Sequence, residues 1–428
     1  MKKSKPLIMV AAFIAFALVV CAIVAVVFSS LARRPGLTAF NDSDLIPTRA
    51  DIPVVSNAFW TLVKATNELY WPLSKDSELR GLSDSTNWND ALAAEVVEKN
   101  HALLDLFDTA MRQPSLLVTE PKTFDEGYPY LSDWITISRM ESIRVFVFFR
   151  AKNEREAFDT AFKMIRFGHR IENSGGPVIH YFVGSSIKAR GLLRIQQMTA
   201  QSTLKESDVI KFIRELDSFR SNKEGLTNAL KVDYQLGCLY INDFAAGKIL
   251  STNSGEQTVN SIGLKPLFNA AKTQQKFAQA IRVVRDNISK PFGKMDWSGL
   301  PLVETNTSVW RRLVSGNALG DMIFDMLEPS LEGRSARKCR EDVNVTATQL
   351  LLALKIYKKE QGRLSASLSE LVPEFFPQVP IDDFDGKPFR YLPDKKLIYS
   401  VGPDLKDSGG DNSHKNPISD DISFRIEF

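Results

Sequence analysis

Apolar residues recur at helical spacing through most of the chain, from about residue 55 to residue 337. They stand three and four positions apart, which is typical of helices that bury one face. We therefore expect a mainly α protein whose central part, residues 55–337, is an irregular α-helical domain. The expected helices cover residues 56–71, 88–112, 131–150, 153–173, 178–200, 206–220, 224–247 and 265–288. A solenoid-like stack and a bundle would both bury such faces, and no repeat of about 34 residues favours the stack.

Turn and capping residues support the boundaries of these helices. Asn89 and Asp90 offer side-chain oxygens to the first free N–H groups of the helix that follows them. Residues 173–177 read Asn-Ser-Gly-Gly-Pro, which ends one helix and places Pro177 in the first turn of the next. Residues 250–263 are mostly polar and predict a loop.

The C-terminal residues 341–428 follow a different pattern. Residues 343–361 predict a helix, and residues 364–376 predict a second, short one. Alternating apolar positions then predict strands around Phe389–Tyr391, Leu397–Tyr399 and, as an edge strand, residues 422–428. Asp385-Gly386 is a turn dipeptide. We expect a small α+β module with a three- to four-stranded antiparallel sheet.

Several segments of this module stand in an order that belongs to one known family. They are "GR", "SLSELVP", "PIDDFDGKPFRY", "YSVGPD", "GGD" and "DDI". With the helix before them they resemble the globular domain of the type II secretion major pseudopilins, over about a fifth of the chain. The resemblance implies a helix, a three-stranded sheet and a calcium-binding loop. Two departures stand out: Asp383 replaces a usual proline, and the stretch between Gly410 and Asp420 is longer and contains Pro417.

The resemblance also selects metal ligands. It points to Asp404, Asp420 and Asp421, with Asp411 behind them, as the residues that would hold calcium. Calcium takes six to eight oxygen ligands, so these carboxylates suit it if the loop folds back on itself. The alternative is a solvated acidic loop that needs no ion. The spacing of an EF-hand is absent.

The N-terminus predicts a membrane anchor. Residues 7–28 form an unbroken apolar run of 22 residues, between three lysines before it and Arg33 and Arg34 after it. A run of this length crosses a hydrocarbon core of about 30 Å, whereas the apolar part of a cleavable signal peptide has only about 7–15 residues. We expect a leader and transmembrane helix at 1–34 and a linker at 35–54, with cleavage after residues 30–32 as the alternative. The N-terminus is expected in the cytoplasm and the bulk in the periplasm, and the processing signature of a true prepilin is absent.

Composition narrows the function classes. The hydrophobic fraction of 44% and the charged fraction of 25% are those of a folded protein. A net charge of +3 gives no electrostatic basis for binding nucleic acid. Residues 341–428 hold 11 Lys and Arg against 15 Asp and Glu, so the module is mildly acidic. Cys238 and Cys339 are expected to be two free, buried thiols, although a disulfide would be allowed outside the cytoplasm.

Catalytic patterns are sparse. Ser185 and Lys188 match Ser-x-x-Lys, but the Ser-Asp-Asn and Lys-Thr-Gly elements that accompany it in serine acyl-transferases are missing. His169, Glu172 and His180 flank a glycine turn and could face each other across a helix pair, as a metal or acid–base site. Capping or partly buried histidines are the alternative. No zinc-protease, phosphate-loop or dinucleotide motif occurs.

These observations favour a single-pass inner-membrane protein of a Gram-negative-type envelope with a binding or scaffolding role and no turnover. Its expected partners are the inner membrane and an envelope protein, and its expected ion is calcium. The alternatives are a component of secretion or pilus assembly and an envelope hydrolase with a site in the helical domain. The first alternative rests on the fold, which by itself does not fix function.

Overall fold

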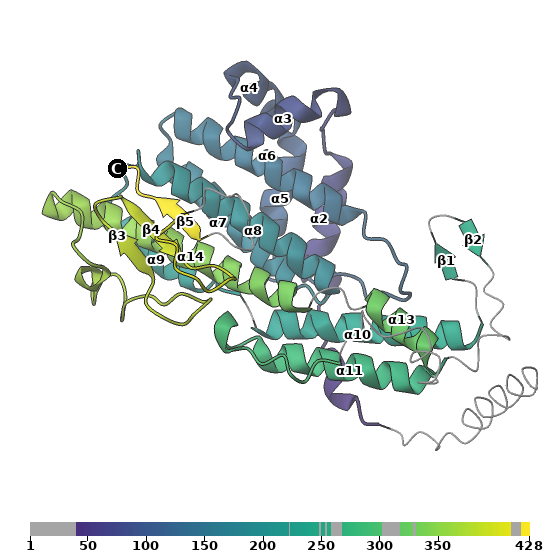
Figure 1. Ribbon diagram of the computed structural model, residues 1–428. Helices are drawn as coiled ribbons and strands as arrows, with labels where there is room; N and C mark the ends of the chain where they lie inside the picture. The colour runs from purple at the N-terminus through teal and green to yellow at the C-terminus, as the bar shows by residue number, and fades with distance from the viewer. Residues whose placement is uncertain are drawn as a thin grey trace, which may run out of the picture.

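The chain is mainly helical and ends in a small three-stranded antiparallel sheet, as expected (Figure 1). This computed structural model describes residues 40–221, 223–247, 250–252, 255–257, 268–301, 317–327, 331–411 and 421–428. The expected membrane span at residues 7–28 lies outside these ranges. Within them, no helix combines the length and the apolar character needed to cross a membrane.

The helices of the central part lie where the apolar rhythm predicts them, with small changes at their ends. They are α2 (Ala58–Asn67), α4 (Asp90–Lys99), α5 (His101–Arg112), α6 (Tyr130–Arg150), α7 (Glu154–Glu172), α8 (Val178–Thr199), α9 (Glu206–Asp217), α10 (Lys223–Ala245) and α11 (Ala270–Asn287). The sequence did not predict α3 (Asp76–Ser83), α13 (Ala318–Leu327) or the short 3-10 turns η1 (Ser43–Leu45), η2 (Val54–Ser56), η3 (Leu73–Lys75) and η6 (Phe292–Lys294).

The expectation of one helix over residues 88–112 was wrong, because the chain breaks at Asn100. The side chain of this buried residue accepts from Tyr70 N at 2.9 Å and donates to Tyr70 O at 3.0 Å. An asparagine that bonds a distant backbone competes with helix continuation. The expected cap at Asn89 is confirmed, since its side chain accepts from Leu92 N at 3.0 Å.

Helices α7 and α8 form the centre of the molecule, and α6 lies beside them (Figure 1). Glycines allow the two central helices to approach closely. A Cβ at Gly184 would lie 2.5 Å from Gly168 O, which is closer than any stable contact. The largest apolar core runs from α7 and α8 through α9 into the C-terminal module, so one continuous core joins the two parts.

Residues 40–54 belong to the expected linker, but they are docked on the helical body. Leu45 is fully buried in a core that α10 and α11 supply. Asp44 forms ion pairs with Arg282 at 2.7 Å and Arg285 at 2.6 Å. This part of the linker is therefore attached to α11 by charge and by burial.

The helix that leads into the C-terminal module is longer than expected. Helix α14 (Leu331–Gln361) begins ahead of residue 343 and packs against both α8 and α9. The expected boundary between residues 337 and 341 therefore falls inside a helix that both parts share. The predicted helix at 364–376 is reduced to the 3-10 turn η7 (Leu368–Leu371).

The sheet confirms the strand predictions in this module. Its order is β3 (Arg390–Leu392), β4 (Leu397–Ser400) and β5 (Ile422–Arg425), with β4 in the middle. Ile398 pairs with Phe424, and both side chains are buried in the core that α14 contributes to. Gly386 has φ of 71°, so the predicted turn at Asp385-Gly386 has the backbone that its glycine favours. Lys396, in the turn between β3 and β4, also has a positive φ, of 50°.

Two smaller expectations are also settled. Within the polar segment at 250–263, where we expected a loop, β1 (Leu250–Thr252) and β2 (Gly255–Gln257) form an antiparallel pair. Cys238 and Cys339 are both free thiols, as expected, and Cys339 is fully buried. Cys238 is only partly buried, so the expectation of burial was wrong for this residue. Burial raises the pKa of Cys238 to about 11 and that of Cys339 to about 12, so both thiols stay protonated.

Candidate functional site

The three residues of the expected acid–base site have different surroundings. His180 is 1% exposed, and its Nε2 is hydrogen-bonded to the hydroxyl of Tyr130 at 2.8 Å. Burial lowers the pKa of His180 to about 4, so its ring is neutral at physiological pH. His169 packs on Phe219, with its Nδ1 3.6 Å from Glu172 Oε2. His180 is therefore part of an aromatic cluster rather than a partner of Glu172.

Glu172 belongs to a buried ion cluster around Lys188. The Lys188 ammonium donates to Glu172 Oε2 at 2.8 Å and to Phe219 O at 2.9 Å, and it contacts Glu341 Oε1. Tyr181 donates to the other Glu341 oxygen at 3.3 Å. Burial raises the pKa of this hydroxyl well above its usual value, so Tyr181 remains a donor.

This cluster connects α7, α8, the end of α9 and α14. The side chains of Lys188 and Glu172 are 0% exposed, so solvent and substrates do not reach them in this structure. Ser185, the other half of the Ser-x-x-Lys pattern, is 5% exposed. The amine that the pattern would use as a base is held by two carboxylates and a carbonyl. The arrangement fits a structural tie and gives no support to a nucleophilic Ser185.

The acidic C-terminal loop is organised by Asp421, which is 3% exposed. Its Oδ2 accepts from Ser408 N at 3.1 Å and from Gly410 N at 2.8 Å. Its Oδ1 is buried and has no hydrogen-bond partner among the described residues. Burial, followed by the charges of Asp407 and Asp404, raises the pKa of Asp421. A buried carboxylate oxygen with no donor is a position that a cation would satisfy.

The other expected ligands are placed less tightly around Asp421. Asp404 Oδ1 accepts from Lys406 N at 3.0 Å, as in an Asx turn. Asp411 lies beside Asp421, because its carbonyl accepts from Asp421 N at 3.2 Å. Asp420 lies outside the described residues. Asp407, which the resemblance did not select, accepts from Tyr399 OH and Gly409 N, both at 3.0 Å.

Calcium fits the loop in part. The free oxygen of Asp421 and the carboxylates of Asp404 and Asp411 are ligands of the right kind. Among the described residues, however, these carboxylates do not come together within ligand distance of one another. A calcium ion would require Asp404 to move toward Asp421, or would use Asp420.

Another carboxylate group does come together on the surface. Side-chain oxygens of Glu206 on α9, Glu360 on α14 and Glu374 lie within 4.8 Å of one another, and all three residues are exposed. Partial desolvation, and then a hydrogen bond with Glu206 and its charge, raises the pKa of Glu360. Exposed acidic groups of this kind occur without a metal, and we assign none here.

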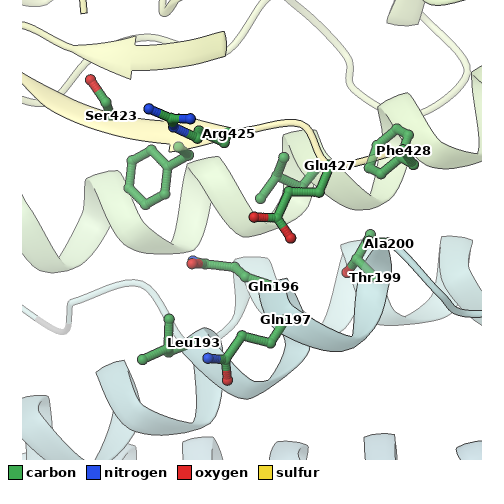
Figure 2. A pocket seen from close by; sticks show the side chains of 11 residues that line it. Leu193, Gln196, Gln197, Thr199, Ala200, Ser423, Arg425, Glu427 and Phe428 are labelled. Atoms are coloured by element: carbon green, nitrogen blue, oxygen red, sulfur yellow. The ribbon is translucent and has the colours of Figure 1, made fainter. Parts of the chain in front are cut away.

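A groove lies between strand β5 and the second half of helix α8, with a cavity volume of about 300 Å³. Figure 2 shows its two walls. Residues at the end of the chain form one wall, and residues of α8 form the other. The side chain of Glu427 points across the groove toward α8. The lining residues are Leu193, Gln196, Gln197, Thr199, Ala200, Leu351, Ser423, Phe424, Arg425, Glu427 and Phe428.

Strand β5 forms one edge of the sheet and has backbone groups that β4 does not use. Ile426 N donates to Lys396 O at 2.9 Å, and Phe424 pairs with Ile398, so these two residues face β4. In an antiparallel pair the intervening residues turn their N–H and C=O groups the other way. These are Ser423, Arg425 and Glu427, and no backbone hydrogen bond from another described segment reaches them. The sequence predicted the edge strand, but it could not show that α8 makes the edge one wall of a groove.

Comparison with known proteins adds no further assignment. No protein-family model, no curated protein and no solved structure matches this chain.

Proposed function

We propose that this protein is anchored in the inner membrane of a Gram-negative-type envelope and binds an extended segment of a partner protein along β5. The observation that carries the proposal is the row of outward backbone groups at Ser423, Arg425 and Glu427, residues that line the groove beside α8 and receive no backbone hydrogen bond from another described segment. A peptide that adds a strand to an exposed sheet edge gains main-chain hydrogen bonds from such groups. The role is binding, with no turnover.

The walls of the groove indicate which segment would fit. Arg425 and Glu427 are exposed and have no ion-pair partner among the described residues. Side chains directly opposite on neighbouring strands favour unlike charges. We therefore expect a partner strand with an acidic and a basic residue two positions apart. Leu193 on α8 is 44% exposed and offers an apolar contact beside them.

The anchoring and the ion belong to the same proposal. The apolar run at residues 7–28 supports attachment to the membrane, with the helical body and the module in the periplasm. Calcium at Asp421, with Asp404, Asp411 or Asp420 as further ligands, would stiffen the loop that leads into β5. The ion would thereby fix the strand that forms the binding edge.

A proline at position 425 tests the edge directly. The Arg425 N–H faces away from β4, so Arg425→Pro removes an outward donor and blocks strand addition without removing a bond of the existing sheet. Arg425→Ala is the matched control, because it removes the same side chain and keeps the N–H. A displayed library of ten-residue peptides is selected on the purified full chain in detergent. We expect alternating acidic and basic peptides that bind the alanine variant but not the proline variant. Selection of no such peptide, or equal binding to both variants, would overturn the proposal.

The same positions distinguish the alternatives in the cell. A photocrosslinking residue at position 425 should join the full-length protein to its partner, whereas one at the exposed hairpin position 395 should not. If the crosslinked partner is a secretion or pilus-assembly component, the protein is part of that machinery. An envelope hydrolase with its site at His169, Glu172 and His180 would instead need these side chains to be reachable by substrate, and the burial of Glu172 and His180 argues against it.

A further inference from the structure

A second cavity lies on the helical body, away from the sheet edge, between the first turns of α10 and the end of α11. Its volume is about 630 Å³. Thr48, on the chain segment that docks against these helices, completes the wall, and its N–H donates to Asn228 Oδ1 at 2.7 Å. The lining residues are Thr48, Lys223, Glu224, Thr227, Asn228, Lys231, Arg285, Asp286 and Ser289.

Three residues of α10 that carry hydrogen-bond donors line this cavity. Lys223, Thr227 and Lys231 are four positions apart, so they lie on one face of the helix, and all three line the cavity. The Thr227 hydroxyl oxygen is buried, and none of the described residues forms a hydrogen bond with it. A buried hydroxyl without a partner loses its hydration and gains nothing in return, so a ligand atom is the natural complement.

The charges of the lining favour an anion. Lys223, Lys231 and Arg285 are positive, and Glu224 and Asp286 are negative. Arg285 is already paired, with Asp286 at 3.0 Å and with Asp44 at 2.6 Å. Within the part of the chain that the structure describes, no hydrogen bond or ion pair occupies the ammonium groups of Lys223 and Lys231. Two free cations and a free hydroxyl on one face therefore line a cavity that is large enough for a ligand.

We propose that this cavity binds a phosphate group. The ammonium groups of Lys223 and Lys231 would each donate to a phosphate oxygen, and the Thr227 hydroxyl would donate to a third. Phosphate has several strong acceptor oxygens and negative charge, so charge-assisted hydrogen bonds of this kind are its usual means of recognition. The phosphate could belong to a soluble phosphorylated compound or to the headgroup of an anionic phospholipid. The site is independent of the β5 groove and of the proposed peptide partner.

The test uses the full chain in a neutral detergent. Inorganic phosphate is titrated against the intact protein, the Lys223→Gln/Lys231→Gln variant and Thr227→Val, with chloride added to keep ionic strength constant. The matched control is Lys205→Gln/Lys211→Gln, which removes the same charge from exposed positions on and beside α9. We expect the double variant at 223 and 231 to weaken phosphate binding roughly 10- to 100-fold and the control to leave it unchanged. Melting without phosphate verifies that each variant is folded.

A second arm separates the two sources of the phosphate. The chain is placed in nanodiscs of phosphatidylglycerol and phosphatidylcholine, and the retained lipids are counted by native mass spectrometry. Retention of phosphatidylglycerol that is lost in the double variant supports a lipid headgroup. Tight binding of inorganic phosphate without lipid preference supports a soluble ligand. The proposal is overturned if the double variant binds phosphate as well as its control does. It is also overturned if the intact protein neither binds phosphate nor retains phosphatidylglycerol in preference to phosphatidylcholine.

Discussion

Asp383 of the C-terminal module reaches Arg220 of the helical body, with Asp383 Oδ2 3.5 Å from Arg220 Nη1. Behind this pair, Asp342 accepts from Ser221 N at 2.7 Å and is paired with Lys338 at 2.9 Å. Asp383 stands where the resemblance to pseudopilins suggests a proline. In this chain the residue contributes to the contact between the module and the body.

Replacement of Asp383 should change how stability depends on pH. Burial, followed by the charge of Asp342, raises the pKa of Asp383 from 3.8 to about 7, while Arg220 and Lys338 oppose the shift and Asp382 adds to it. The folded protein therefore holds a proton between about pH 4 and pH 7 that the unfolded chain has lost. The stabilisation from this proton is complete below pH 4 and is lost as the pH rises through 7, by roughly 2–4 kcal/mol. Asp383→Asn should remove this dependence, measured by urea unfolding from pH 4.5 to pH 8.

Asp394→Asn is the control for this measurement, since Asp394 is exposed at the hairpin tip. It should keep the pH dependence of the intact protein. If the Asp383→Asn curve runs parallel to the control curve, Asp383 does not titrate as described.

Lys188 should be among the most sensitive single positions in the helical body. Lys188→Met leaves Glu172 and Glu341 buried without their cation. Loss of one partner from a buried ion pair costs about 3–5 kcal/mol, because the remaining charge stays uncompensated. We expect a decrease of this size in the free energy of unfolding, measured with urea at pH 7.

The charge argument is tested by restoring neutrality. Lys188→Met combined with Glu172→Gln and Glu341→Gln should recover most of the loss, and the single change Ser185→Ala should cost less than about 1 kcal/mol. Failure of the triple variant to recover stability would assign the role of Lys188 to packing rather than to charge.

The sequence predicts local structure here better than it predicts the contacts between distant segments. Asn89 and Pro177 each stand directly before the helix whose start they favour, so the starts of α4 and α8 could be predicted. The Lys188 cluster could not, because Glu341 is brought to it by α14 from a distant part of the sequence. The same holds for the groove, whose walls, at Gln196 and Arg425, meet only in the folded chain.

The close contact of α7 and α8 predicts that Gly184→Ala is destabilising. In an exposed helix this change stabilises by about 0.5–1 kcal/mol. In α8 the new Cβ would lie 2.5 Å from Gly168 O and 2.8 Å from Glu172 N, so the helices must separate. We expect a loss of about 1–3 kcal/mol, as for other overpacked cores. Gly127→Ala is the control, because no atom lies within 4 Å of its added Cβ. Similar unfolding free energies for both variants would contradict this account of the helix contact.

The free oxygen of Asp421 predicts that calcium stabilises the intact chain. A ligand that binds only the folded state raises the melting temperature, and we expect a rise of about 3–8 °C in millimolar calcium relative to chelator. Asp421→Asn keeps an acceptor for Ser408 N and Gly410 N but removes the charge that would hold the ion. In chelator its melting temperature should be close to that of the intact protein, and calcium should not raise it.

Two further variants test the other carboxylates. Asp404→Ala should reduce the calcium-dependent rise in melting temperature, and Asp394→Asn should preserve it. Equal melting of the intact protein with and without calcium would exclude the ion, and the acidic loop would then be a solvated one in which Asp421 only caps backbone donors.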